Sequence, residues 1–168
     1  MLSSAKHKIL NNKIEKKPFP FIFIKNFIDK ESLNKLNNIL PSFEEIKGKN
    51  VLYQSSSRTK KTILPSSSIY KKLLKNRPFN SINLLFKKLQ PTIINKFQNE
   101  INLYVKKKFT NKEIKYHSSY SVMKKGYVKS PHLDRRDHLI HMIFYPSSES
   151  SKGGDICLNS LKKKKKTF

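Results

Sequence analysis

Two side chains that can bind a metal ion lie two positions apart in the sequence, His132 and Asp134. They belong to the stretch GYVKSPHLDRRDHLIHMIFYP, residues 126–146, in which an apolar run follows them. In an extended chain the side chains of residues i and i+2 point to the same face, so this imidazole and this carboxylate could hold one ion. The spacing therefore predicts a metal-binding pair at one end of a strand.

The residues on both sides of this pair have the period of β-strands. Before it, alternate positions place five side chains on one face: Ile114, Tyr116, Ser118, Tyr120 and Val122. After it, Ile140, Met142 and Phe144 alternate with a second set, which consists of Leu139, His141, Ile143 and Tyr145. A turn at Gly153 and Gly154 then leads into a third predicted strand, DICL.

Residues 18–112 are predicted to be mainly helical support for these strands. Near their start they contain FPFIFIKNFI, whose aromatic and β-branched residues predict a buried strand. Asp29 is placed to cap a helix with an inner stripe of leucines, and residues 51–65 predict a loop with one short strand. Apolar spacing then predicts a short helix before Pro78 and a longer helical block that is broken at Pro91.

The two ends of the chain differ from this middle part. Residues 1–17 are polar and without an apolar period, which predicts a flexible basic arm. Residues 162–168 include five consecutive lysines, whose mutual repulsion predicts a solvated polylysine tail. One domain is therefore expected over residues 18–161, with helical support over 18–112 and strands over 113–161.

The formal net charge of +25 suggests a polyanionic partner, such as nucleic acid or an anionic membrane surface. However, only four of the 36 basic residues are arginines, and the excess of lysine is typical of an AT-rich genome. Because bidentate base contacts depend on arginine, a sequence-reading nucleic-acid protein is disfavoured, although a nucleic-acid partner stays open. The lone Cys157, the absence of a secretory signal pattern and the shortness of every apolar run predict a cytoplasmic protein without a membrane span.

The combined pattern resembles the Fe(II)/2-oxoglutarate-dependent oxygenases of the prolyl 4-hydroxylase-like group. PFPFIFIKNFIDKESLNKL is similar to that group's first strand and helix, and YSVMKKGYVKSPHLD to its tyrosine, glycine-tyrosine and HxD segment. LIHMIFYP resembles the strand after HxD, and GGDICL the turn into the next strand. The likeness is scattered over residues 18–158 and is weakest from 44 to 112.

This resemblance implies a fold, a reaction and two cofactors. The fold would be α+β, with N-terminal helices supporting a double-stranded β-helix, a jelly-roll or cupin-like sheet that is incomplete here. The enzyme would oxidise a C–H bond with 2-oxoglutarate and oxygen, giving succinate and carbon dioxide, and ascorbate is a further cofactor to consider. Such iron is held by two histidines and one carboxylate, of which His132 and Asp134 would supply two.

The resemblance also implies roles for several aromatic residues. Tyr145 matches a tyrosine that hydrogen-bonds 2-oxoglutarate, and Tyr120 matches one that lines the same pocket. Tyr127 is placed to line the entrance, and His141, on the strand face of Tyr145, to approach it. The alternative is that the three tyrosines only pack in half-buried positions and that His141 is an ordinary strand histidine.

The sequence departs from the family after the predicted second strand. No histidine follows His141 and no arginine follows Arg136, so the distal iron ligand and the basic partner of 2-oxoglutarate have no counterpart. The chain thus reads as a truncated or inactive copy whose substrate, a protein side chain, a sugar or a small molecule, and whose oligomeric state are open. The alternative functions are a basic module that binds nucleic acid or an anionic surface, and a scaffold without catalysis.

Overall fold

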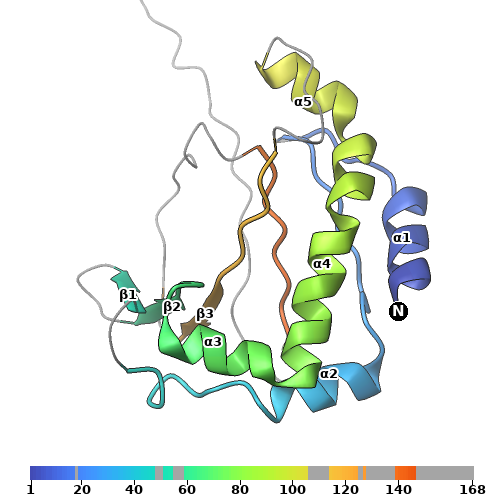
Figure 1. Ribbon diagram of the computed structural model, residues 1–168. Helices are drawn as coiled ribbons and strands as arrows, with labels where there is room; N and C mark the ends of the chain where they lie inside the picture. The colour runs from blue at the N-terminus through green and yellow to red at the C-terminus, as the bar shows by residue number, and fades with distance from the viewer. Residues whose placement is uncertain are drawn as a thin grey trace, which may run out of the picture.

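A long helix, α4 (Arg77–Lys96), forms the centre of the molecule, which is described by a computed structural model (Figure 1). The structure describes residues 1–17, 19–47, 51–54, 59–105, 114–124, 127 and 139–146. Its helices are α1 (Leu2–Asn11), α2 (Lys30–Asn37), α3 (Ser68–Lys75), α4 and α5 (Gln98–Val105), and its strands are β1 (Val51–Gln54), β2 (Lys60–Ile63) and β3 (Tyr120–Met123). The chain is therefore a mixed α+β protein, as predicted.

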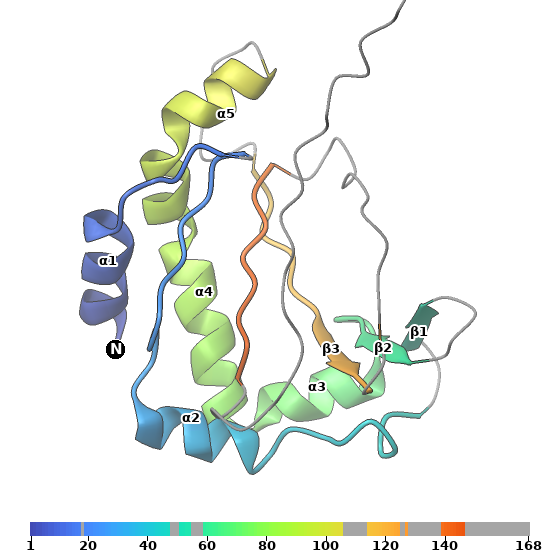
Figure 2. The same cartoon turned by 180° about the vertical axis from the view of Figure 1, so that it is seen from behind.

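The core around α4 follows from the apolar spacing of that helix. Its buried residues recur every three or four positions, so they form one stripe: Ile82, Leu85, Leu89 and Ile93. Helix α1 lies on one side of α4, and residues 114–119 and 139–146 run as extended segments on the other (Figures 1 and 2). Helix α2 packs at the N-terminal end of α4 through Leu36.

Helix α4 continues through Pro91, so the predicted break at this residue is wrong. Pro91 and the residue four positions earlier, Lys87, are both exposed. The carbonyl that loses its partner to the proline ring therefore lies on the solvent side, where water can satisfy it. The helix instead ends at Phe97, whose φ of −101° and ψ of 14° depart from helical values, and α5 follows.

The N-terminal residues do not form the flexible arm that was predicted for residues 1–17. Leu2–Asn11 form helix α1, whose Ala5 and Ile9 are 1% and 2% exposed against the α4 core. Two apolar residues at spacing i, i+4 make a stripe too narrow to detect in a polar sequence. The Nζ atom of Lys96, in the last turn of α4, donates to the Leu10 carbonyl over 2.6 Å and adds a polar tie.

The aromatic stretch after Pro20 is extended but forms no strand within the described residues. Phe21 makes a single antiparallel bridge with Glu15, and Asn26 turns the chain with a φ of 50°. Phe27 then stacks on Phe86 of α4 with ring centroids 5.7 Å apart. Phe23 is 70% exposed, so the predicted buried strand is wrong: one face of the segment packs on helices, and no strand in the described ranges pairs with it.

Helices α2 and α3 each begin at a side chain that caps them. The Asp29 carboxylate accepts from Ser32 N over 2.7 Å at the start of α2, which confirms the predicted cap. These hydrogen bonds from the backbone and hydroxyl of Ser32 lower the pKa of Asp29. The Ser67 hydroxyl caps α3 in the same way, accepting from Tyr70 N over 3.1 Å.

The sheet is small, antiparallel and open. Its order is β1-β2-β3, with Val51 opposite Ile63 and Ile63 opposite Tyr120. A second core cluster, Ile46, Val51, Ile63 and Tyr70, joins the sheet to α3. In the part of the chain that the structure describes, the sheet does not close and no jelly roll is formed. None of the helices in those ranges is long and apolar enough to cross a membrane.

Candidate functional site

The predicted metal ligands His132 and Asp134 lie outside the described residues. The two predicted strands that flank them are largely described, as residues 114–124 and 139–146. These two segments lie on the same side of α4 and are the described parts of the chain nearest to the proposed site in sequence (Figures 1 and 2).

The segment before the HxD motif has the alternation that the sequence predicts. From residue 114 to residue 120 the even-numbered side chains are partly buried and the odd-numbered ones are exposed. Only its end pairs as a strand, β3, where the hydroxyl groups of Thr62 and Ser121 lie 2.8 Å apart. The sequence therefore predicts the alternation of this segment correctly, but the first half of the segment packs against helices rather than pairing with a strand.

A hydroxyl cluster holds this first half against α3 and α4. The Ser118 hydroxyl lies 2.6 Å from the Tyr70 hydroxyl and 3.1 Å from the Asn83 amide oxygen. The Tyr70 and Tyr116 hydroxyls lie 3.3 and 3.4 Å from the same amide oxygen. Nearby, the Gln90 side-chain amide donates to the Ile114 carbonyl over 2.7 Å.

The number of protons in this cluster limits how it is bonded. Each hydroxyl has one proton to donate, and the Asn83 oxygen has two lone pairs. Tyr116 donates to one lone pair of the Asn83 oxygen. The other lone pair accepts from one hydroxyl of the Tyr70–Ser118 pair, and the second hydroxyl of that pair donates to the first. All three hydroxyls then have a hydrogen-bond partner within the cluster. Burial raises the pKa of Tyr116, and Ser118 opposes this shift with a smaller lowering effect.

The sequence does not predict the hydroxyl cluster, although three of its four members lie in elements that the sequence predicts. Tyr116 and Ser118 were assigned to a strand face, and Tyr70 to the apolar side of a short helix. Asn83 gave the available signal, because it is a polar residue between the apolar positions Ile82 and Leu84. That signal becomes specific only when the fold brings the four side chains together.

Tyr120, predicted to line the cofactor pocket, packs into the second core cluster. Its ring makes an edge contact with Phe79 at a centroid distance of 6.4 Å. Burial raises the pKa of Tyr120 to about 12, because the packed surroundings disfavour the charged phenolate. The described contacts of Tyr120 are thus those of a half-buried tyrosine that packs in a strand.

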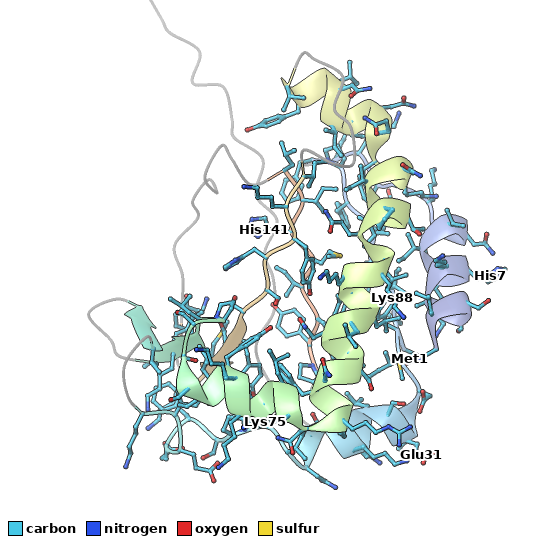
Figure 3. The ribbon with its side chains drawn as sticks, viewed as in Figure 1. Met1, His7, Glu31, Lys75, Lys88 and His141 are labelled. Atoms are coloured by element: carbon cyan, nitrogen blue, oxygen red, sulfur yellow. The ribbon has the colours of Figure 1, made fainter. Side chains whose placement is uncertain are left out.

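The segment after the HxD motif also alternates. Ile140, Met142 and Phe144 pack towards the α4 core, where the Phe144 ring lies 5.6 Å from that of Phe86. The side chains of His141 and Tyr145 are exposed on the opposite face, as the alternation predicts. Figure 3 shows the side chain of His141 on this segment. Tyr145 is 46% exposed, and its partial burial raises its pKa.

Tyr127, the predicted entrance residue, is half-buried beside the sheet. Its backbone N–H donates to the Lys124 carbonyl over 3.1 Å, and the Nζ atom of Lys60 lies 5.6 Å from its ring centroid. These contacts associate Tyr127 with β2 and the end of β3. His141 and Tyr145 are therefore the two predicted pocket residues that the structure places on one face.

Within the described ranges, no three His, Cys, Asp or Glu side chains come close enough together to hold a metal ion. Comparisons of the chain with protein-family models, with curated proteins and with solved structures find no match. The interpretation of the site therefore rests on the sequence pattern and on the two flanking segments.

Proposed function

We propose that this chain is a protein of the Fe(II)/2-oxoglutarate-dependent oxygenase family, similar to the prolyl 4-hydroxylase-like group. In this proposal residues 113–161 form the front part of a double-stranded β-helix. His132 and Asp134 hold the metal ion, and Tyr145 lies nearby. The substrate is a protein side chain, a sugar or a small molecule with an oxidisable C–H bond.

The observation that carries this proposal is the two-faced segment of residues 139–146. Its inner face packs on α4, and its outer face presents His141 and Tyr145. A strand that follows HxD and lines a pocket needs this division, because one face must anchor it while the other meets the ligand. The alternation before the motif, at residues 114–120, supports the same arrangement.

The chemistry of the donor set agrees with iron. An imidazole and a carboxylate at spacing i, i+2 are two of the three ligands in the facial arrangement used by non-haem iron oxygenases. Bound iron and 2-oxoglutarate, with ascorbate as a possible accessory reductant, supply the oxidising chemistry in such enzymes. The protein's part is to hold the metal through His132 and Asp134. The Tyr145 phenol, which is protonated at neutral pH, would donate to a carboxylate of 2-oxoglutarate.

Metal titration tests this proposal directly. Mn(II), a redox-inert stand-in for Fe(II), is titrated into the full chain and into His132→Ala and Asp134→Ala variants by calorimetry. Each substitution removes one of two proposed ligands, so we expect at least a tenfold loss of affinity. His117→Ala is the matched control, because His117 is exposed on the segment before the motif. Equal affinities in all four proteins would overturn the proposed metal site.

A second candidate is a basic binding module without catalysis. The observation that favours it is the net charge of +25. Such a module would bind a polyanion with a steep dependence on salt and without dependence on metal. The same preparation distinguishes the two candidates, because chelation of divalent metal would leave the polyanion binding of such a module unchanged, whereas the first candidate requires metal binding that depends on His132 and Asp134.

A further inference from the structure

The basic charge of the chain is unevenly distributed along the sequence. Residues 46–99 contain twelve lysines and arginines and no aspartate or glutamate, so all 11 acidic residues lie outside this stretch. A genome-wide drift towards lysine raises the number of lysines everywhere, but it does not remove acidic residues from one stretch. The stretch includes β1, β2, α3 and α4.

Within this stretch, four cations gather at the junction of α3 and α4, which we call the basic corner: Lys71, Lys72, Lys75 and Arg77. All four are exposed. At 100° per residue the three lysines of α3 lie within an arc of about 100°, opposite the buried Leu73. Figure 3 shows Lys75 near the end of α3 that meets α4.

The two acidic residues immediately before this stretch in sequence are already engaged elsewhere. Glu44 pairs with Lys124 at 2.8 Å, and the Glu45 carboxylate accepts from Ser42 N over 2.7 Å. Elsewhere, a helical lysine can have an acidic partner on its own helix, as Lys35 of α2 has in Glu31. The described residues thus provide ion pairs on α2 and at the end of β3, and none of those pairs includes the basic corner.

Helix stability accounts for only part of this charge. Lys72 and Lys75 lie in the last turn of α3, where the helix dipole favours cations. Arg77 is the first residue of α4, where the dipole disfavours a cation, and Lys71 lies in the middle of α3. A bound anion would relieve the repulsion among these four charges.

We infer that the basic corner binds the phosphate backbone of a nucleic acid without reading its sequence. Lysines at i and i+4 are about 6 Å apart on a helix, which lets neighbouring side chains contact successive phosphates. Contacts of this kind need no arginine forks, so the scarcity of arginine excludes base reading but not backbone binding. A membrane is disfavoured because the apolar face of α3, Tyr70 and Leu73, is buried in the protein.

This inference rests on the second candidate function and is independent of the metal site. The test measures fluorescence anisotropy of a labelled 20-nucleotide poly(U) RNA with the full chain at rising salt. The variant is the triple substitution Lys71→Glu, Lys72→Glu and Lys75→Glu. The matched control changes three exposed lysines elsewhere, Lys6→Glu, Lys25→Glu and Lys30→Glu, and alters the net charge by the same amount.

We expect the basic-corner variant to bind at least tenfold more weakly than the control variant. Its slope of log affinity against log salt should also be smaller by about 2, because each phosphate contact to a single strand contributes roughly 0.7. Equal losses of RNA affinity in the two variants would overturn the assignment of RNA binding to the basic corner and would indicate general polyanion binding. No RNA binding by the parent chain would overturn both the basic-corner site and the second candidate function. Binding to phosphatidylserine vesicles that depends on the corner, without RNA binding, would identify a membrane surface instead and overturn the nucleic-acid inference.

Discussion

The hydroxyl oxygen of Ser118 lies 2.6 Å from that of Tyr70, although 48 positions separate the two residues in sequence. This contact joins the segment before the HxD motif to α3, and Asn83 extends it to α4. The segment is thus fixed by side chains before it reaches the sheet at β3. The helices α3 and α4 would therefore help to fix the position of a metal-binding pair that follows this segment in sequence.

Substitution of Asn83 should therefore destabilise the fold. Asn83→Ala removes the shared acceptor, so the Tyr116 hydroxyl and one hydroxyl of the Tyr70–Ser118 pair have no acceptor in the cluster, and we expect the free energy of unfolding to fall by about 1–3 kcal/mol. Urea denaturation followed by circular dichroism measures this change. Asn99→Ala, at an exposed position of α5, is the control and should change stability by less than about 0.5 kcal/mol. A result for Asn83→Ala equal to that of the control would mean that the cluster contributes nothing to stability.

Helix α1 should contribute to stability rather than being dispensable. Ile9→Ala opens a cavity against α4 and should lower the free energy of unfolding by about 2–5 kcal/mol. The adjacent Leu10 is 53% exposed, so Leu10→Ala tests the same chemical change outside the core and should have a much smaller effect. Equal melting temperatures for the two variants would restore the flexible arm that the sequence suggested.

Local patterns in the sequence predicted the parts of the fold that depend on near neighbours. The cap at Asp29 and the helix at residues 68–75 are formed by groups within four positions of one another, and both are confirmed. The same holds for the face shared by His141 and Tyr145, which depends only on their spacing. These features need no knowledge of which distant segments come together.

The errors arose where a distant partner decides the outcome. Ile9 is apolar in a polar stretch, and only α4 makes its helix part of the core. A proline inside a helix is tolerated where the carbonyl that loses its hydrogen bond faces solvent, and both Pro91 and Lys87 are exposed. The hydroxyl cluster could not be predicted either, because it requires Tyr70, Asn83 and Ser118 to meet across three elements.

The raised pKa of Tyr120 predicts a loss of stability in alkali. Its folded-state pKa of about 12 exceeds the usual value of 10, so between these values the unfolded chain releases a proton that the folded protein retains. Stability from this group is complete below pH 10 and is lost as the pH rises to 12. Tyr120→Phe should weaken this dependence in urea titrations, whereas Tyr104→Phe, at an exposed site, should not. Parallel pH profiles for the parent chain and Tyr120→Phe would contradict the assignment.

The most direct consequence of the proposed metal site concerns turnover. In residues 1–168 the proposed site has two protein ligands, because no histidine follows His141, and no arginine follows Arg136 to grip the far carboxylate of 2-oxoglutarate. Two ligands hold a metal ion more weakly than three, and the missing charge-assisted hydrogen bond is worth roughly 1.5–3 kcal/mol. We therefore expect this 168-residue chain to bind divalent metal but to form no measurable succinate from 2-oxoglutarate.

Succinate is measured by NMR after incubation with Fe(II), ascorbate, 2-oxoglutarate and oxygen, with His132→Ala and His141→Ala variants alongside. The absence of succinate from all three proteins, together with metal binding that depends on His132, is the expected result. Succinate formed by the parent chain and abolished by His132→Ala would show the expectation wrong. If His141→Ala also abolished it, the exposed face that His141 shares with Tyr145 would supply the third ligand. If His141→Ala left it intact, that ligand would come from a second copy of the chain or from His138, which lies four positions after Asp134 in the sequence.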